Sequence, residues 1–554
     1  MTLQVTAAIT LPRVSSPQRW ILFVALLLLE GAVWVEPAGS WLAEPDEARY
    51  AEIPREMLAS GDFVTPTLNG VPYLEKPPLL YWANAASVRL FGLTPWAARL
   101  PTRLFGLGTV LTLLFGTAAI WGTPAGLAAA ILYLAAPLGF AFSRVNLTDA
   151  PLTFFFTLTL FLARATLLRR EAGRPWARLS ALAGLAAAGG FLSKGLVAVV
   201  LPGAILLLWC LATRRARFLW TLVFAPAALV FLLVAAPWFA LAELRTPGFL
   251  HFFFIHEHFQ RFSTSAARRP GPIYYFVLIF LAGFLPGVPF FVSSLKKAWR
   301  RDEPDALLFL LWFGVVLVFF SLSRSKLPPY LMPAFPPAAA LAALALFGRT
   351  PAGTGAWRVS ALLAALLPTF VILNPTARAW VRDYGLAPIA VAGFAVLLLG
   401  TWAASQLAKR SASLALGALA AGWTGFAVMA ALVWPRIPPA TDPYAICVAA
   451  AAAARSDGAI VVGYQAYLQN LPLALESPVP LADYVGELEP QFEHRPEIRE
   501  SLFWTREKFW SQWRSGRRYA ALIRPRDLKE FQTSGVPARV LASAPKHFLL
   551  ANYR

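Results

Sequence analysis

Carboxylates and cations gather in one polar stretch near the N-terminus, WLAEPDEARYAEIPREMLASGDFVTPTLNGVPYLEKPPLLYW at residues 41–82. This stretch holds seven of the chain's 29 acids and follows directly on a long apolar run. A charged side chain that enters lipid costs roughly 3 kcal/mol on insertion scales, so acids beside an apolar run seldom serve packing. A solvated loop with a surface helix would also account for the charges. We interpret the stretch as part of a site at a membrane surface.

The composition identifies the class of protein. Hydrophobic residues make up 58% of the chain and charged residues 14%, whereas a soluble domain carries about 25% charge. The chain is therefore a polytopic α-helical membrane protein. Its net charge of +20 is explained by basic cytoplasmic loops and anionic lipid, so we expect no nucleic acid partner. The two cysteines, Cys210 and Cys447, indicate neither a disulfide framework nor a cysteine metal site.

The apolar runs predict about thirteen transmembrane helices, because each is close to the roughly 17 to 25 residues that a span requires. The first run lacks a small-residue cleavage site, so it is interpreted as a retained anchor. Lys194 divides a longer apolar stretch into two short helices. The predicted spans lie near 20–37, 98–118, 123–142, 150–168, 178–193, 196–213, 218–240, 273–294, 305–322, 330–348, 358–374, 387–405 and 412–434.

The basic residues between these spans predict the orientation. With an odd number of spans, the clusters of Lys and Arg all fall on one side, which the positive-inside rule makes cytoplasmic. The first loop (37–97), the loop at 145–149, the segment 241–272 and the loop at 323–330 then share the other face. We expect a bacterial inner membrane protein whose site and C-terminal domain face the periplasm.

The C-terminal residues 435–554 are predicted to form a soluble α/β domain beyond a transmembrane domain at 1–434. Residues 458–464 and 518–525 resemble buried strands, and 441–454 and 500–513 resemble helices. The aromatic helix at 500–513 either rests on lipid or packs against its own strands. Its motifs give this domain no catalytic role.

The acids and cations predicted on the outer face indicate the kind of reaction that this site could perform. Asp46, Glu47 and Asp149 lie at equivalent heights, so one cavity could contain them. ATP is not expected there, which leaves donors delivered by the membrane, chiefly polyprenyl-phosphate sugars. Cations on this face are few, and a lipid phosphate in a partly dry site needs such partners. Ordinary snorkelling would explain any single one, but four together predict phosphate binding: Lys76, Lys194, Arg261 and Lys326.

The segment FLHFFFIHEHFQRF at 249–262 carries three of the five histidines. His256 and His258 are two residues apart, so on a helix they diverge by about 200° and form no two-ligand face. An interfacial helix with aromatics at the headgroups is the favoured reading. A zinc site with Glu75 and His256 is the alternative. No cofactor is expected to be required.

The motifs EPDEARYAEI, YLEKPPLLYW, NLTDAPLTFF, FIHEHFQRF and SKLPPYLMPAFPP together resemble those of the lipid A aminoarabinose transferases. This family belongs to the membrane glycosyltransferases of the GT-C architecture, which include the protein O-mannosyltransferases. The resemblance covers the whole chain. It implies transfer of 4-amino-4-deoxy-L-arabinose from undecaprenyl phosphate to a lipid A phosphate, and with it resistance to polymyxin and other cationic peptides. It also implies interfacial helices in the first loop and the histidine segment, as a lid over the cavity.

The resemblance places the family's first-loop catalytic acid on Asp46 and its second-loop acid on Asp149. A lipid A phosphate is already ionised near neutral pH, with a second pKa of about 6, so Asp46 need not act as a base. We expect it to orient the sugar or to stabilise positive charge at the anomeric carbon. Lys76 and Arg261 would hold the departing phosphate. Residues placed near sugar or lipid are Arg49, Tyr50, Tyr73, Tyr81 and Tyr330.

Two other functions remain. A polyprenyl-phosphate-sugar transferase of the same fold could act on protein or on another glycan. A polyprenyl-phosphate transporter would show paired repeats and broken helices near the midplane, and the sequence has no internal repeat. We expect a monomer surrounded by membrane lipids.

Overall fold

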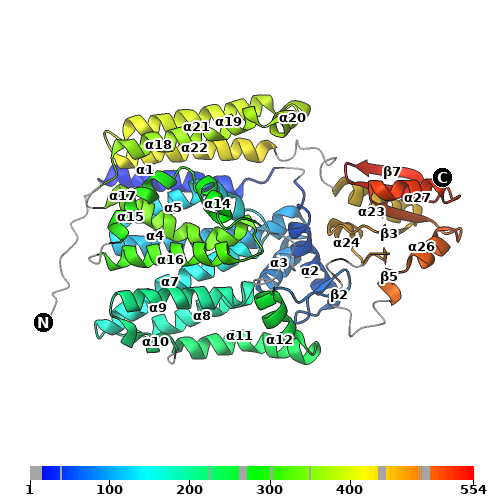
Figure 1. Ribbon diagram of the computed structural model, residues 1–554, viewed down its shortest axis with the longest axis horizontal. Coiled ribbons are helices and arrows are strands. Elements are labelled where there is room, and N and C mark those ends of the chain that lie inside the picture. Colours follow the sequence, from blue (N-terminus) through cyan, green and yellow to red (C-terminus); the bar gives the residue numbers. More distant parts are fainter. Residues whose placement is uncertain are drawn as a thin grey trace. The chain divides into compact units, whose positions relative to one another are not determined.

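The chain forms two compact units in this computed structural model (Figure 1). The helical unit comprises Met1–Glu36, Thr102–Ala240 and Leu250–Val433. The loop unit comprises Pro37–Pro101, Leu241–Phe249 and Trp434–Arg554. The structure describes residues 15–37, 40–223, 226–260, 271–299, 303–348, 351–433, 444–484, 486, 488 and 500–553. The predicted boundary at 434/435 differs from this division, since the first loop groups with the C-terminal residues.

Helices account for nearly all of the helical unit, as the apolar runs predict. Many are rich in Ala and Leu, which favour helix. They are α1 (Ser16–Trp34), α4 (Pro95–Trp121), α5 (Thr123–Ala135), α6 (Pro137–Phe142), α7 (Asp149–Glu171), α8 (Ala177–Lys194), α9 (Val197–Ala212), η1 (Ala216–Phe218), α10 (Trp220–Val223), α11 (Pro226–Arg245), α12 (Phe249–His251), the π-helix η2 (Phe252–Gln260), α14 (Tyr275–Gly283), α15 (Val288–Ala298), α16 (Pro304–Leu322), the 3-10 helix η3 (Pro328–Ala334), α17 (Phe335–Phe347), α18 (Thr354–Ala364), α19 (Leu366–Leu373), α20 (Pro375–Asp383), α21 (Ala387–Leu407) and α22 (Ala412–Val433).

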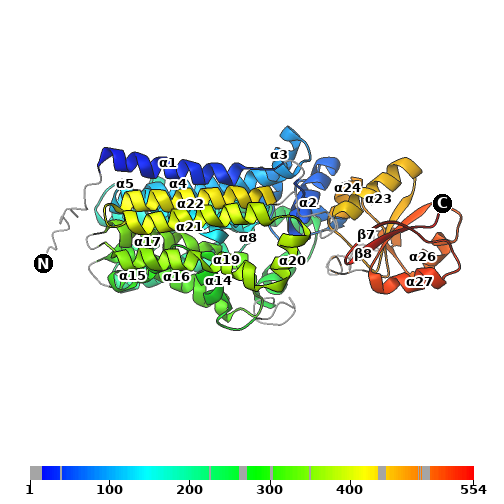
Figure 2. The ribbon, with the colours of Figure 1, turned by 90° about the horizontal axis from the view of Figure 1, so that it is seen from above.

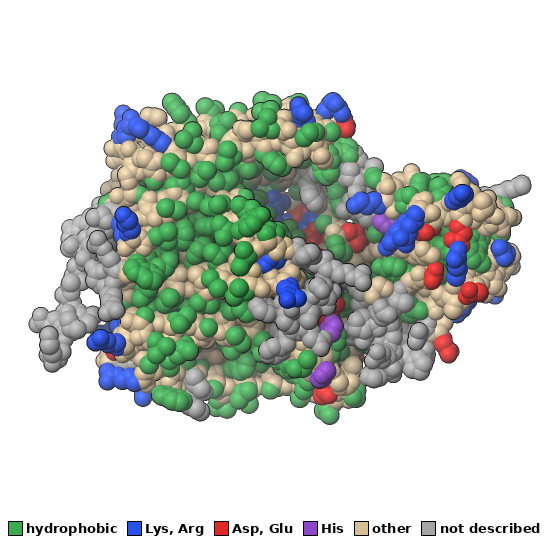
Figure 3. All heavy atoms as spheres, in the orientation of Figure 1, with side chains coloured by type: hydrophobic (Ala, Val, Ile, Leu, Met, Phe, Trp, Pro, Cys, Tyr) green, Lys and Arg blue, Asp and Glu red, His purple; other side chains and the backbone are tan. Residues whose placement is uncertain are grey.

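Within the described residues, nine helices are long and apolar enough to cross a membrane. A tenth is added if α14 and α15, which are bent by 115° at their break, count as one span. Helices α5 and α9 are apolar but shorter. The face of the helical unit seen in Figure 3 is mostly hydrophobic, with Lys and Arg gathered at its left end. The chain is therefore a polytopic membrane protein.

Small residues set the closest helix contacts. Helices α21 and α22 lie side by side (Figures 1 and 2), and their backbones touch at two glycines. A Cβ on Gly400 would lie 2.5 Å from the Cα of Gly422. In lipid, where apolar burial gives helices little drive to associate, such close packing supplies much of the attraction.

The loop unit begins with α2 (Asp46–Ser60), the short hairpin of β1 (Thr67–Leu68) and β2 (Val71–Pro72), and α3 (Leu79–Phe91). Gly61, in the left-handed conformation with φ of 72°, ends α2. Asn69 and Gly70 have φ of 54° and 74°, which the tight hairpin turn requires. The first loop thus contains two helices, and their placement along the membrane surface stays a prediction.

The C-terminal part of the loop unit is an α/β sandwich with helices on both faces of one sheet (Figure 2). The strand order is β5-β4-β3-β6-β8-β7, and β5, β4, β3 and β6 run parallel. On β3, Val461 faces one core and Val462 the other, the period of two expected of a strand. The elements are α23 (Tyr444–Asp457), β3 (Ile460–Tyr464), α24 (Asn470–Leu475), β4 (Leu481–Ala482), β5 (Phe503–Trp504), α26 (Arg506–Trp513), β6 (Tyr519–Ile523), η6 (Pro525–Asp527), α27 (Leu528–Thr533), β7 (Arg539–Ala544) and β8 (His547–Ala551).

The strands expected at 458–464 and 518–525 are present as β3 and β6. The single helix expected at 500–513 is wrong, because Phe503–Trp504 pairs with β4 and only Arg506–Trp513 is the helix α26. Phe509 and Trp513 are buried in the core beneath the sheet. The aromatic helix thus packs against its own strands.

A methyl group at the α21–α22 contact tests this packing. Gly400→Ala should lower the stability of the detergent-solubilised protein by about 1–3 kcal/mol, because the obstructing atoms are backbone and cannot rotate away. Thermal unfolding measures it. Gly203→Ala on α9 is the matched control, since no described heavy atom lies within 4 Å of its Cβ position, and Ala is the better helix former. Equal melting temperatures for the two variants would contradict the prediction.

Candidate active site

Two adjacent acids begin α2, where carboxylates are favoured by the partial positive charge of a helix N-terminus. Glu47 is buried and forms a bidentate pair with Arg99, at 2.8 Å to Nε and 2.6 Å to Nη2. It also accepts a hydrogen bond from the backbone N–H of Ala43. Such pairing offsets much of the cost of burying the carboxylate. Glu47 is therefore fixed in place.

Asp46 has a different environment. Its side chain is 40% exposed, and the guanidinium of Arg49 lies 3.2 Å from Oδ1. Arg49 in turn lies over the ring of Tyr73, 5.6 Å from the centroid. Of the two acids, Asp46 is the accessible one, with a cation that can set its direction.

The loop-unit tyrosines are packed inside. Tyr50, Tyr73 and Tyr81 are all buried, and the rings of Tyr50 and Tyr81 lie 5.9 Å apart. Burial raises the pKa of Tyr81 well above its usual range. The backbone carbonyl of Tyr50 accepts a hydrogen bond from the side chain of Asn84. These rings therefore pack in the interior of the loop unit, with Tyr73 beneath Arg49, and do not extend into solvent.

Lys76 lies in the linker between the hairpin and α3. Its ammonium donates to the backbone carbonyl of Glu75 at 3.0 Å and lies 4.0 Å from the Glu75 carboxylate. Both side chains are partly exposed. The Lys76 ammonium is thus held beside Glu75 and is partly open to solvent.

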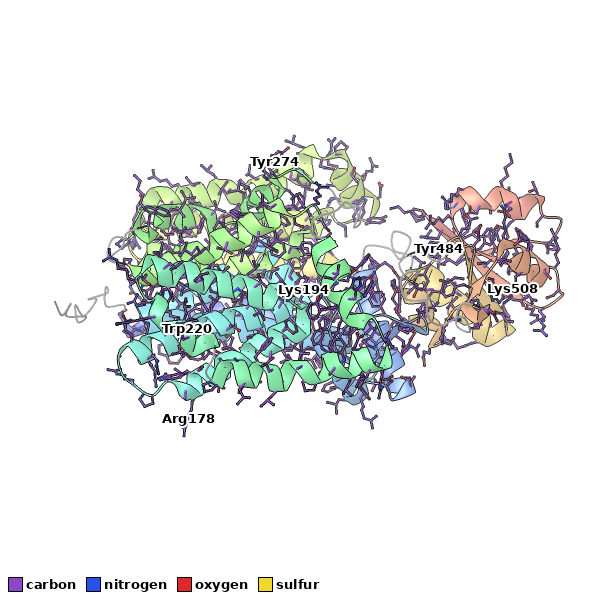
Figure 4. The ribbon with its side chains drawn as sticks, turned by 60° about the horizontal axis from the view of Figure 1, so that its bottom comes forward. Arg178, Lys194, Trp220, Tyr274, Tyr484 and Lys508 are labelled. Atoms are coloured by element: carbon purple, nitrogen blue, oxygen red, sulfur yellow. The ribbon has the colours of Figure 1, made fainter. Side chains whose placement is uncertain are left out.

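A second cluster lies in the helical unit. Lys194, at the last turn of α8, donates to Asp149 at the first turn of α7, with 2.5 Å between Nζ and Oδ1. Its ammonium also lies 4.9 Å from the centre of the Tyr330 ring. Figure 4 shows Lys194 and Arg178 at opposite ends of α8. The predicted Asp149, Lys194 and Tyr330 are thus brought together.

Lys326 is buried at the end of α16. Its ammonium donates to the carbonyls of Ser321 at 2.7 Å and Ser323 at 2.6 Å, where the helix leaves carbonyls unpaired. Burial lowers the pKa of Lys326. In this arrangement the Lys326 ammonium caps the C-terminal end of α16.

The histidine segment forms the π-helix η2, where His256 stacks on Phe252 and lies 3.5 Å from the Glu257 carboxylate. Among the residues that the structure describes, no group of three or more His, Cys, Asp or Glu side chains is placed to hold a metal ion. The pairing of Glu75 with His256 stays a prediction. Arg261 and the His258 side chain lie outside the described residues.

The sequence analysis did not predict the partners of three acids near the start of the chain, Glu36, Glu44 and Glu47. Arg99 holds Glu47, Arg103 pairs with Glu36, and Glu44 accepts from backbone N–H groups at residues 469 and 470. The requirement that each buried acid has a cation nearby could have pointed to Arg99, which follows the first loop. No sequence signal links Glu44 to a segment more than 400 residues away.

Two family models match the chain. The model described as dolichyl-phosphate-mannose-protein mannosyltransferase matches residues 24–253, and the one described as aminoarabinose transferase C-terminal domain matches residues 447–552. The chain is 36% identical over 337 residues to the undecaprenyl phosphate-alpha-4-amino-4-deoxy-L-arabinose arabinosyl transferase of Pectobacterium carotovorum subsp. carotovorum (strain PC1), and 34% identical over 357 residues to that of Aeromonas salmonicida (strain A449). These matches span 59% and 63% of the relatives' own length, under two thirds.

Solved structures give a longer match. ArnT from Cupriavidus metallidurans bound to undecaprenyl phosphate superposes with a TM-score of 0.82 at 29% identity, covering 96% of this chain and 97% of that one. The apo state of the same protein also gives 0.82 at 29% identity, over 97% and 99% of the two chains.

The Asp149–Lys194 pair makes a prediction about stability. Lys194→Ala should destabilise the protein by about 3–5 kcal/mol, because it leaves a buried carboxylate unpaired. Adding Asp149→Asn should restore much of this loss. Thermal unfolding in detergent measures both.

Arg215→Ala is the control, because the Arg215–Glu171 pair has a similar 2.7 Å distance but a carboxylate that is 36% exposed. A pair open to solvent contributes only about 0–1 kcal/mol. If Lys194→Ala and Arg215→Ala cost the same, the Asp149 pair is not effectively buried.

Proposed function

Because the chain belongs to the aminoarabinose transferase family of membrane glycosyltransferases, we propose that it transfers 4-amino-4-deoxy-L-arabinose from undecaprenyl phosphate to a phosphate of lipid A. The observation that carries the proposal is the match over 96% of this chain to ArnT bound to undecaprenyl phosphate. The accessible Asp46, with the guanidinium of Arg49 beside it, agrees with such a donor. Resistance to cationic peptides such as polymyxin would follow from the loss of negative charge on lipid A.

The reaction needs little proton transfer. A phosphate oxygen of lipid A attacks the anomeric carbon, a new C–O bond forms, and the bond from that carbon to the donor phosphate breaks. The bonding electrons leave with undecaprenyl phosphate. Both phosphates are largely ionised near neutral pH, so the protein's task is to position the sugar and to balance charge.

We assign Asp46 to the sugar. Its carboxylate is exposed and aligned by Arg49, so it suits the 4-ammonium group of the sugar or the positive charge that develops at the anomeric carbon. Glu47 is already saturated by Arg99, and we assign it to holding α2. Asp149 is assigned to orienting Lys194.

We assign the donor phosphate to lysines and to Arg261. Lys76 is partly exposed, so an anion can approach its ammonium from solvent. Lys194 has Asp149 and the Tyr330 ring as neighbours, and Lys326 would have to leave two carbonyls to reach a phosphate. Lys76 is therefore the first candidate. A zinc ion on Glu75 and His256 is the least supported assignment.

The membrane arrangement is also a proposal. Thirteen spans, including the short α5 and α9, α8 and the bent α14–α15 pair, would place the basic loops together in the cytoplasm. The first loop and the C-terminal sandwich would then face the periplasm from the inner membrane. We expect a monomer. An acceptor on protein or another glycan is the alternative, which the family model of protein mannosyltransferases keeps open.

Mass spectrometry of lipid A tests the function. A bacterial strain that supplies the donor but lacks its own transferase should gain lipid A carrying the mass of aminoarabinose when this chain is expressed. Asp46→Asn should abolish the product while the protein still inserts, because the amide removes the charge that faces the sugar. The matched control is Asp483→Asn, an exposed acid of the C-terminal sandwich. Unmodified lipid A with wild-type protein present, or full modification by Asp46→Asn, would overturn the respective assignment.

Binding of undecaprenyl phosphate to purified variants tests Lys76. Lys76→Ala should weaken binding about ten- to a hundredfold, because a hydrogen bond to a charged group contributes about 1.5–3 kcal/mol. Lys76→Arg should restore part of it, given its different donor geometry. Lys529→Ala, an exposed lysine on α27, is the control. Wild-type affinity in Lys76→Ala would move the phosphate to Lys194 or Lys326.

A further inference from the structure

We propose that the C-terminal sandwich positions Asp46, acting through Glu44. The carboxylate of Glu44 accepts hydrogen bonds from two successive backbone N–H groups, those of Gln469 at 3.1 Å and Asn470 at 2.5 Å. Glu44 stands two residues before Asp46, at the entry to α2. The inference rests on the proposed function for the role of Asp46, and it makes Glu44 a positioning residue that need not contact substrate.

Asn470 also forms a second hydrogen bond to the segment around Glu44. Asn470 is buried, and its side-chain amide donates to the backbone carbonyl of Leu42 at 3.0 Å. Leu473 of α24 packs with Leu42, Ala51 and Ala98 in a small apolar cluster. The segment that leads into α2 is therefore held on both sides of Glu44, by groups that come from residues 470 and 473.

A second contact holds the hairpin that follows α2. The amide of Asn69 accepts from the backbone N–H of Val479 at 2.7 Å and donates to the Val479 carbonyl at 3.0 Å. Its neighbour Gly70 donates to the carboxylate of Glu56 on α2 at 3.1 Å. The hairpin thus links Val479 to the second half of α2.

A third contact lies between these two. Arg55 on α2 donates to the backbone carbonyl of Glu476 at 3.0 Å and forms a bidentate pair with Glu52 at 2.6 and 2.7 Å. All three contacts reach the short stretch 469–479. Helix α2 is consequently held next to its first residue, through Glu44, and in its second half, through Arg55 and through the hairpin that contacts Glu56.

This arrangement bears on the reaction because Asp46 sits at the end of α2 that Glu44 fixes. Arg49, its partner within the described chain, lies on the same helix and moves with it. The direction of the Asp46 carboxylate is then set by where α2 begins. A displacement of about 1 Å in a positioned catalytic group can cost roughly a hundredfold in rate.

The use of a charged group at this point also needs a reason. The two N–H groups donate to different oxygens of Glu44, Gln469 to Oε2 and Asn470 to Oε1, so a neutral amide with a single acceptor oxygen could not reproduce both hydrogen bonds. Charge-assisted bonds are also shorter and roughly twice as strong as neutral ones. The carboxylate therefore fixes the segment before Asp46 at two points.

Kinetics with the purified full-length chain test the proposal. Glu44→Ala should lower kcat about ten- to a hundredfold and leave KM for undecaprenyl-phosphate aminoarabinose within about threefold, because the phosphate-binding lysines are untouched. Glu44→Gln, which keeps one acceptor oxygen, should recover part of kcat. A loss confined to KM, or a kcat within about twofold of wild type, would overturn the proposal.

Asn552→Ala controls for a purely structural effect. Asn552 donates to the carbonyls of Trp513 and Arg517 and accepts from the N–H of Tyr519, so its loss weakens the same sandwich without touching residues 42–44 or 469–479. If Asn552→Ala lowers the melting temperature as much as Glu44→Ala does, Asn552→Ala should still keep the wild-type kcat. Equal kcat losses in the two variants would mean that Glu44 serves stability alone.

Hydrogen exchange separates this proposal from the proposed function, because it needs no substrate. Amides in the first turn of α2 should exchange at least about tenfold faster in Glu44→Ala than in Asn552→Ala, since local opening replaces the lost contact. Unchanged protection of that turn would reject the positioning role even if the enzyme is active. Faster exchange without any lipid A modification by wild type would reject only the proposed function.

Discussion

Withdrawing a carboxylate from water is costly unless a cation or several N–H donors accompany it, and this constraint acts in both units of the chain. Glu47 has Arg99, Asp149 has Lys194, and Glu44 has two backbone N–H groups. Each partner comes from another element, so satisfying the charge also fixes two elements together. Asp46, the accessible acid of the first loop, stands among neighbours that are already neutralised. The exposure of Asp46 and the fixed positions of the neighbouring acids are therefore consequences of the same requirement.

The sequence predicted the elements that depend mainly on residues close together along the chain. Apolar length predicts the spanning helices, and short apolar runs predict the buried strands β3 and β6. The first-loop acids could be placed on one polar element because lipid excludes them. The pairing of Asp149 with Lys194 and Tyr330 was anticipated only as a shared face, since three side chains from separate helices meet through packing that no local pattern encodes.

Tertiary contacts decided the rest. Phe503 and Trp504 lie in a helical pattern but pair with β4, because an edge of the parallel sheet offers backbone partners that override local preference. Lys326 was predicted for phosphate, yet the unpaired carbonyls of α16 hold it in this structure. The contacts of Glu44 and Asn69 with residues 469–479 had no sequence signature, since hydrogen bonds to backbone groups leave the partner's residue type unspecified.

The loop unit joins Pro37–Pro101 to Trp434–Arg554, and within it Glu44 contacts Gln469, which lies 425 positions further along the chain. During synthesis α2 therefore emerges well before the residues 469–479 that hold it. Long-range contacts of this kind form late. A chain that stops short can insert its helices but lacks the groups that hold α2. The position of α2 thus depends on a part of the chain that is made long after it, so α2 is fully held only once residues 469–479 have been synthesised.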